Sequence, residues 1–267
     1  MNKSTYSSDL DVNNFITWIE PKLSIENSFK HSYISKKPKG KFECNSIYSA
    51  YENYFWDKES FNKNQIKLIE FSRKINNGIE NNNHDLVKQG CEDVLKWGGV
   101  SGNSKRGNLK KINELDIVEY LKNVKNHISI ELCEDGSSDY SSIHCNSGFS
   151  KIYSSIVDNF IIYDSRVSCA LCYLIRLYAK DNSKEEIPEN LRFAYTIGRN
   201  ENKNPSNKNF IFRKIYTPYN YLKFNIMASW LLKLILEKTK SKFNNLPDNI
   251  QLRALESALF MIGYKIN

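Results

Sequence analysis

The chain has 267 residues and a formal net charge of +8, with 40% hydrophobic and 13% aromatic residues. This composition is typical of a folded protein with a substantial core and excludes a disordered chain. No run approaches the roughly 20 apolar residues of a membrane span, and the polar first residues form no signal-peptide core. We therefore expect a cytoplasmic protein without a membrane partner, in which six scattered cysteines form no disulfide framework.

Apolar residues recur at helical spacing in six segments, which predicts a mostly α-helical fold. The segments are 64–76, 84–96, 114–128, 165–180, 225–238 and 250–262. Gly78 is expected to mark the end of the first segment. Residues 1–60 are rich in aromatics but show no clear period, so we expect an irregular N-terminal layer with short helices. Residues 61–267 would form the helical domain, as one body or as two tightly packed lobes.

One lysine and one aspartate, Lys151 and Asp164, stand near the starts of two successive helical segments. A helical stretch of about seven residues after the lysine would run roughly 10 Å away from it. A turn at Asp158 and Asn159 and an extended apolar run over 160–163 can cover the same distance back. We therefore expect the lysine amine and the carboxylate to share one small volume.

Only one of these two residues has a simple structural explanation. Asp164 precedes an apolar helical face and fits an N-cap, which is the commonest reason for an aspartate at such a place. A lysine at a helix start is unusual, because the helix dipole disfavours cations there. Partial burial beside that positive end favours the neutral, nucleophilic amine. Lys151 is therefore the stronger candidate for chemistry.

The run from Gly148 to Lys151, with the stretch 163–167, resembles the catalytic hairpin of the helix-hairpin-helix DNA glycosylases. It is most similar to the branch with the 8-oxoguanine DNA glycosylase fold. The resemblance implies that a damaged or modified base is flipped out of duplex DNA, that Lys151 attacks the sugar C1′ and that Asp164 assists. An associated lyase activity and a role in DNA repair or anti-phage defence would follow.

Two features depart from that family. Residues 144–148 keep one glycine of the usual hairpin and no proline. The aspartate follows the lysine by 13 positions (164 − 151), which is fewer than is usual in the family. These departures leave open a non-catalytic DNA-binding protein on the same scaffold, and a helical interaction module unrelated to nucleic acid.

The resemblance also suggests further site residues. Those expected to contact DNA near the hairpin are Gly148, Ser150 and Arg166. Those expected to line the base pocket are Trp97, Phe149 and Tyr163. Paired glycines after Trp97 allow a close backbone approach, although an ordinary helix end is the simpler explanation.

Positive charge is concentrated in residues 192–240, which hold ten basic and two acidic residues, a net of +8 (10 − 2). Such a field suits a polyanion, although a solvated Lys- and Asn-rich surface is an alternative. The expected DNA contacts in this segment are Arg199, Lys203, Lys208, Arg213 and Lys214. Its aromatics suit stacking on a base as well as core packing: Phe193, Tyr195, Phe210, Phe212, Tyr216, Tyr219, Tyr221 and Phe224.

The sequence offers no metal or cofactor signature. Cys169 and Cys172 have the CxxC spacing but fall inside a helical pattern, where we expect them to pack. The four histidines are too dispersed to suggest a site. We therefore expect a monomer that needs no cofactor and acts on double-stranded DNA with a damaged or modified base.

Overall fold

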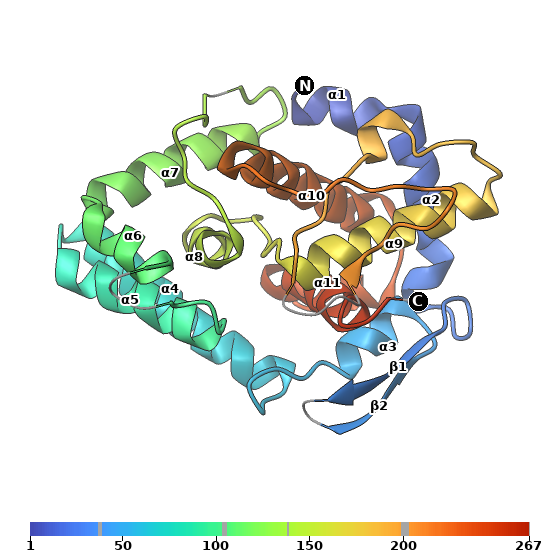
Figure 1. The fold of residues 1–267 in the computed structure, drawn as a ribbon, viewed down its shortest axis with the longest axis horizontal. Coiled ribbons are helices and arrows are strands. Elements are labelled where there is room, and N and C mark those ends of the chain that lie inside the picture. Colours follow the sequence, from blue (N-terminus) through green and yellow to red (C-terminus); the bar gives the residue numbers. More distant parts are fainter. Residues whose placement is uncertain (37–38, 103–105, 138, 199–202, 267) are drawn as a thin grey trace.

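The computed structural model describes residues 1–36, 39–102, 106–137, 139–198 and 203–266. Within these ranges the chain forms eleven α-helices and one two-stranded sheet, which confirms the mostly α-helical class (Figure 1). The six predicted helices are present as α4 (Phe61–Glu80), α5 (His84–Trp97), α7 (Ile117–Glu131), α9 (Ser165–Asp181), α10 (Pro218–Lys238) and α11 (Asp248–Ile262). The described residues also include two 3₁₀ helices, η1 (Glu189–Leu191) and η3 (Lys242–Asn245).

Residues 1–60 are more regular than the sequence analysis expects. They form α1 (Lys3–Ser8), α2 (Leu10–Ser24), the antiparallel hairpin β1 (His31–Lys36) with β2 (Lys39–Cys44), and α3 (Ile47–Glu52). The buried residues of α2 do follow a helical period, at Val12, Phe15, Ile16, Ile19 and Leu23. Pro21 stands inside that period near its end and obscured it. The expectation of an irregular layer is therefore wrong.

The helices form two groups with one shared core. Figure 1 shows α4, α5, α6 (Asn108–Glu114) and α7 on one side, and α1, α2, α3, α9, α10 and α11 on the other. The short helix α8 (Ser147–Ile156) stands between them (Figure 1). A single hydrophobic cluster extends from Tyr6 to Ile266. The expected division at residue 60 therefore does not coincide with any break in the core.

Gly78 lies inside α4 and does not end it. A Cβ at this position would be 2.6 Å from Val87 Cγ2 of α5. The glycine therefore permits close packing of the two helices, and α4 continues to Glu80. Asn82, with φ 52°, makes the turn that follows.

The two cysteines of the CxxC pattern pack inside α9, as predicted. Both are buried, and their thiols donate to backbone carbonyls, Cys169 to Lys203 at 2.9 Å and Cys172 to Phe193 at 3.7 Å. In the part of the chain that the structure describes, no helix combines the length and apolar character needed to cross a membrane.

Candidate active site

The predicted return path between Lys151 and Asp164 is present. After α8 the chain turns at Asp158 and Asn159, which has φ 58°, and residues 160–164 come back without regular structure. Lys151 Nζ lies 3.3 Å from Asp164 Oδ2, and the two side chains are only 5% and 11% exposed. The prediction that the amine and the carboxylate share one volume is confirmed.

Lys151 is the fifth residue of α8 and not its first, because the helix begins at Ser147. The Asn146 side chain caps it by accepting from the N–H groups of Gly148 and Phe149. Helical side chains lean toward the N-terminus. This lean brings Lys151 Nζ back to 3.2 Å from the Ser147 carbonyl oxygen and 3.3 Å from its hydroxyl. The amine therefore lies at the first turn although the residue belongs to the second.

Asp164 is both a helix cap and a counter-ion. Its Oδ1 accepts from the N–H groups of Arg166 at 2.9 Å and Val167 at 3.1 Å, while Oδ2 faces Lys151. Burial raises the pKa of Asp164, but the ammonium of Lys151 and the two N–H groups outweigh it and hold the pKa below its ordinary value. The carboxylate is therefore ionised at neutral pH.

The segment that returns the chain to Asp164 is held by buried side chains of three helices. Its backbone N–H groups donate from Ile161 to Ser229 Oγ at 3.2 Å, from Ile162 to Glu256 Oε2 at 2.7 Å and from Tyr163 to Ser150 Oγ at 2.8 Å. Buried N–H groups need such partners, since an unmade hydrogen bond in the interior costs about 1–3 kcal/mol. Helices α8, α10 and α11 thus position the carboxylate together.

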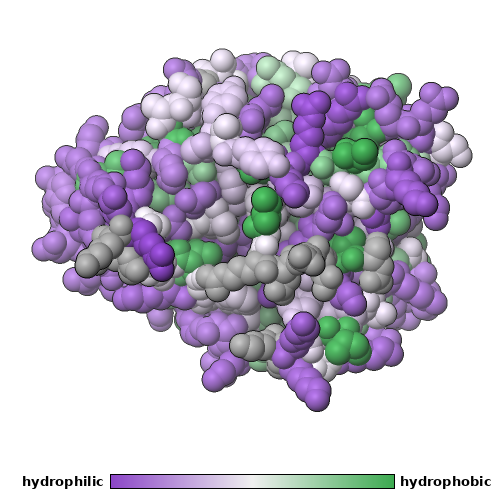
Figure 2. Space-filling view, viewed as in Figure 1, coloured by the Kyte–Doolittle hydropathy of each residue, from purple (hydrophilic) through white to green (hydrophobic). Residues whose placement is uncertain are grey.

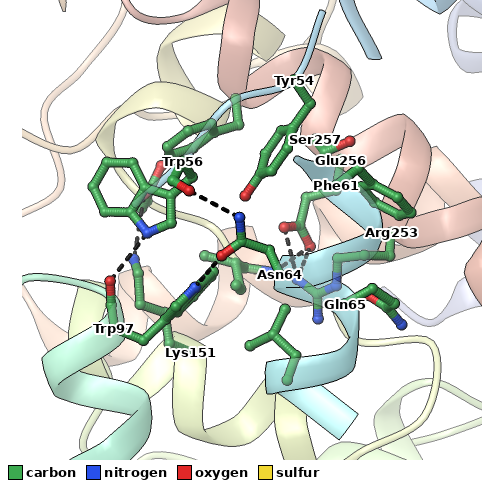
Figure 3. Close-up of a pocket in the computed structure, with 14 residues that line it drawn as sticks. Tyr54, Trp56, Phe61, Asn64, Gln65, Trp97, Lys151, Arg253, Glu256 and Ser257 are labelled. Carbon is green, nitrogen blue, oxygen red and sulfur yellow. Dashed lines mark hydrogen bonds and ion pairs between the residues drawn. The ribbon is translucent and has the colours of Figure 1, made fainter. Parts of the chain in front are cut away.

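A pocket with aromatic walls opens on the ion pair (Figure 3). Its lining rings are Tyr54, Trp56, Phe61, Trp97 and Phe260, and its lining polar side chains are Asn64, Gln65, Lys151, Asp164, Arg253, Glu256 and Ser257. The cavity volume is only about 30 Å³. The pocket is therefore narrow, and its walls would have to separate to admit a nucleobase.

Two tryptophans close one side of this pocket through a cycle of hydrogen bonds. Trp97 Nε1 donates to Asn64 Oδ1 at 2.6 Å, and Asn64 Nδ2 donates to the Trp56 carbonyl at 2.9 Å. Trp56 Nε1 donates in turn to the Trp97 carbonyl at 3.0 Å, as Figure 3 shows. Sequence reasoning missed Asn64, although an asparagine at a buried position of α4, between Phe61 and Leu68, was a signal.

Gly98 gives the paired glycines after Trp97 a specific role. A Cβ at Gly98 would lie 2.5 Å from Lys151 Cδ and 2.8 Å from Cε. The missing side chain leaves the room through which the lysine reaches Asp164. Gly99 has φ 64°, in the left-handed region that favours glycine.

A second buried carboxylate, Glu256, lines the pocket and was not predicted. Arg253 Nη1 donates to both of its oxygens at 2.7 Å (Figure 3). Burial raises the pKa of Glu256 above its ordinary value, although Arg253 opposes the shift. The signal in the sequence was a charged residue on the apolar face of α11, between Leu252 and Leu259.

Phe149 and Tyr163 lie in the core and do not line the pocket. Both are fully buried. Phe149 packs edge-on against His144, with ring centroids 4.9 Å apart, and the Tyr163 hydroxyl donates to the Ala194 carbonyl at 2.7 Å. Their assignment to a base pocket is corrected to a packing role, because the Phe149 ring also contacts Tyr120 of α7 and the Tyr163 ring contacts Tyr221 of α10.

Gly148 and Ser150 also face the interior. A Cβ at Gly148 would overlap Asn108 Nδ2, and the glycine N–H is already accepted by Asn146. The Ser150 hydroxyl is fully buried and accepts from Asn225 Nδ2 at 2.8 Å. The two residues hold α8 against its neighbours, so the expectation that they contact DNA is corrected for this conformation.

Arg166 and Lys203 lie close to Asp164 but outside the pocket lining. The Arg166 guanidinium is over the rings of Phe260 at 4.2 Å and Tyr264 at 4.8 Å. Lys203 Nζ donates to Ser165 Oγ at 3.1 Å, at the start of α9. Burial and the nearby Arg166 lower the pKa of Lys203. The Lys203 amine therefore contacts the residue that follows Asp164 in the chain.

The remaining basic candidates are divided between surface and undescribed positions. Lys208, Arg213 and Lys214 are exposed, whereas Arg199 lies outside the described residues. Figure 2 shows a largely hydrophilic face with scattered apolar side chains. Of the eight aromatics of the basic segment that were named for base stacking, five are buried, so packing explains them: Phe193, Tyr195, Phe210, Phe212 and Tyr221.

Comparison with known proteins identifies no relative. No family model, no curated protein and no solved structure matches the chain. Among the described residues, no group of three or more His, Cys, Asp or Glu side chains could hold a metal ion. The groups that the pocket offers for chemistry include the amine of Lys151 and the carboxylates of Asp164 and Glu256.

Proposed function

We propose that the protein is a DNA glycosylase that excises a damaged or modified base, with Lys151 as the nucleophile and Asp164 as its electrostatic partner. The observation that carries the proposal is the buried amine 3.3 Å from an ionised carboxylate at the wall of an aromatic pocket. A buried ion pair is a weak source of stability, because desolvation offsets its attraction. Its exposure to a cavity therefore favours a chemical role. The resemblance of the hairpin region to the glycosylase family supports the same role.

The first step is loss of the base. A nucleotide flipped out of the duplex, at a cost of a few kcal/mol, would place its base between the rings of the pocket. When the bond from C1′ to the base breaks, its electron pair stays on the base, which takes a proton from the ammonium of Lys151. The carboxylate of Asp164 stabilises the positive charge that develops on the sugar.

The second step is covalent capture of the sugar. The neutral amine of Lys151 forms a bond to C1′. The sugar ring then opens as its oxygen takes the proton that the nitrogen loses, which leaves an iminium. Loss of a C2′ proton expels the 3′-phosphate and breaks the strand, and water then hydrolyses the iminium and frees the lysine. Direct hydrolysis without elimination would end at an abasic site.

The basic segment supports duplex DNA as the substrate. A Cβ at Gly198 would lie 2.7 Å from Lys203 Nζ and 2.9 Å from Ser165 Oγ, so the segment packs against the start of α9 beside Asp164. The Tyr195 N–H donates to the Arg213 carbonyl at 3.0 Å, so the exposed Arg213 and Lys214 belong to a stretch that pairs with the backbone just before Gly198. Phosphate contacts of this kind supply sequence-independent affinity.

The proposal is tested by trapping the covalent intermediate. Incubation with duplexes carrying damaged or modified bases, in the presence of borohydride, should give a protein–DNA adduct. Lys151→Ala should abolish the adduct, whereas Lys180→Ala, at the exposed end of α9, should keep it. Lys203→Ala is the stricter control, because this second amine also lies near Asp164. An adduct that survives Lys151→Ala and disappears in Lys203→Ala would show that Lys203, and not Lys151, is the nucleophile.

The narrowness of the pocket favours one alternative, a DNA-binding protein without chemistry. With a cavity volume of about 30 Å³, the pocket does not accommodate a base in the described conformation. Such a protein would bind duplexes in a salt-dependent manner and release no base from any of them. Mass spectrometry of free bases after incubation separates the two functions.

A further inference from the structure

A second cavity continues the candidate active site along the same helices. The pocket is lined by residues within 61–68 of α4, by Lys151 of α8 and by residues within 253–260 of α11. The second cavity, here called the groove, is lined by residues within 65–73 of α4, by Ser154 and Ser155 of α8 and by residues within 248–256 of α11. In each helix the stretch that lines the groove lies one or two turns further along. The two cavities are therefore arranged end to end between α4, α8 and α11.

Four residues line both cavities and form the wall between them: Gln65, Leu68, Arg253 and Glu256. Beyond this wall the groove is wide, with a volume of about 620 Å³ against about 30 Å³ in the pocket. A displacement of one or two side chains would therefore join a closed site to a broad opening.

The wall has one member tied to the backbone and one held by a side chain. Glu256 accepts from the Ile162 N–H at 2.7 Å. The described hydrogen bonds of the Arg253 guanidinium go to Glu256, so a base that passes the wall would have to break them. Among the described residues Gln65 Oε1 is buried without a hydrogen-bond partner, and Figure 3 shows Gln65 beside Arg253. A buried acceptor of this kind is stabilised when a donor reaches it.

We propose that this groove is the exit for the excised base, a free nucleobase that passes Arg253 while the DNA is still attached to the protein. The inference rests on the proposed function. A covalent bond from Lys151 to C1′ holds the DNA at the pocket, so a released base needs another way out. A ring N–H of the base would satisfy Gln65 Oε1 at the wall. Beyond it, Ser72, Ser154 and Asn249 offer polar partners along the groove.

The test measures where the base is when the DNA is trapped. A duplex with a radiolabelled modified base is incubated with the full chain and borohydride, and the adduct is separated from small molecules by gel filtration. For the wild type, we expect the label in the small-molecule fraction in an amount equal to the adduct. Leu68→Phe narrows the wall, so its adduct should retain the base. Leu86→Phe is the matched control on α5, outside both cavity linings.

The result is the amount of base retained divided by the amount of adduct. This ratio does not change when a variant has less activity or less folded protein. If the base stays with the wild-type adduct, the groove is not its exit. The same holds if the base leaves the Leu68→Phe and Leu86→Phe adducts equally, and in both cases the proposed function stands. If no duplex gives an adduct, the proposed function is overturned and the exit with it. Arg253→Ala supplies an independent variant, because removal of this side chain from the wall should speed release of the base. An unchanged rate of release would contradict the exit.

Discussion

Asp164 uses each of its oxygens for a different purpose, and both purposes depend on the same residue. One oxygen caps α9, and the other faces a buried ammonium. Asp164 is therefore an N-cap, as is common for an aspartate before a helix, but the cap accounts for only one of its two oxygens. Lys151 lies in the second turn of α8 while its amine reaches the first, so the contact of the amine with Asp164 depends on the length of the side chain.

Asp164→Asn separates the two purposes, because asparagine caps helices about as well as aspartate does. The cap should remain, but the ammonium of Lys151 would be left buried without a counter-ion, which lowers the free energy of unfolding by about 3–5 kcal/mol. Base release should be lost while duplex binding in a gel shift is kept. Loss of binding together with release would instead point to a misfolded protein.

The effect of this substitution on stability should vary with pH. Because the folded-state pKa of Asp164 is lowered from its ordinary 3.8, its stabilisation is present above pH 3.8 and is lost as the pH falls through the lowered value. The difference in Tm between wild type and Asp164→Asn should therefore be largest near neutral pH and shrink in acid. Asp9→Asn, at the cap of α2, is the control without a buried ammonium. A difference that does not change with pH would contradict the ion-pair explanation.

Between elements, the decisive contact is that of the end of α5 with α8. Two separate causes explain the glycine pair that ends α5. At Gly98 the Lys151 side chain must pass, and at Gly99 the backbone is left-handed. A sequence pattern that merely ends a helix thus also makes room for Lys151. The helix ends themselves follow local rules, whereas the passing side chain comes from a residue more than fifty positions later.

Gly98→Ala should displace Lys151 without straining the backbone, because φ at Gly98 is an ordinary −74°. We expect a folded protein with little or no borohydride adduct. Gly99→Ala should show the reverse pattern: a left-handed φ costs a residue with a side chain about 1–2 kcal/mol. Space around Gly99 is open, so its adduct should persist. Circular dichroism melting and adduct yield distinguish the two, and equal adduct loss in both would refute the steric explanation.

Across the whole molecule, the site lies where two groups of helices meet, and the basic segment approaches it from the second group. The pocket takes residues from the loop before α4, from α4 and α5, and from α8 and α11. The segment 192–240 holds a charge equal to that of the entire chain, and it packs against the start of α9 beside Asp164. This arrangement would bring a bound duplex to the pocket by long-range attraction.

Arg213→Ala combined with Lys214→Ala should weaken duplex binding for all sequences alike. If both cations neutralise phosphates, the slope of log K against log salt should fall by about 2, since each phosphate contributes about 0.9. Lys122→Ala with Lys125→Ala removes two exposed cations from α7 and serves as the control. Equal losses for the two pairs, measured by fluorescence anisotropy across salt concentrations, would show that the charge acts only as a global field.

The extent of prediction differs between local and distant features. The six helices predicted from their apolar period are all present, and the meeting of Lys151 with Asp164 followed from segment lengths. The interior positions of Phe149, Tyr163 and Ser150 were missed, because the sequence near a site does not tell which side of a helix faces the cavity. Glu256 was missed because it reaches the site through the fold, 94 positions from the Ile162 N–H that it accepts.

By itself, the sequence determined the helices, the cap at Asp164 and the concentration of positive charge, because each depends on residues within a few turns of one another. Only the tertiary structure decided which polar groups share the pocket and which aromatics are core. It also decided that the pocket continues toward a groove behind Arg253. These features arise from contacts between distant segments, whose energies become available only when α4, α8 and α11 pack together.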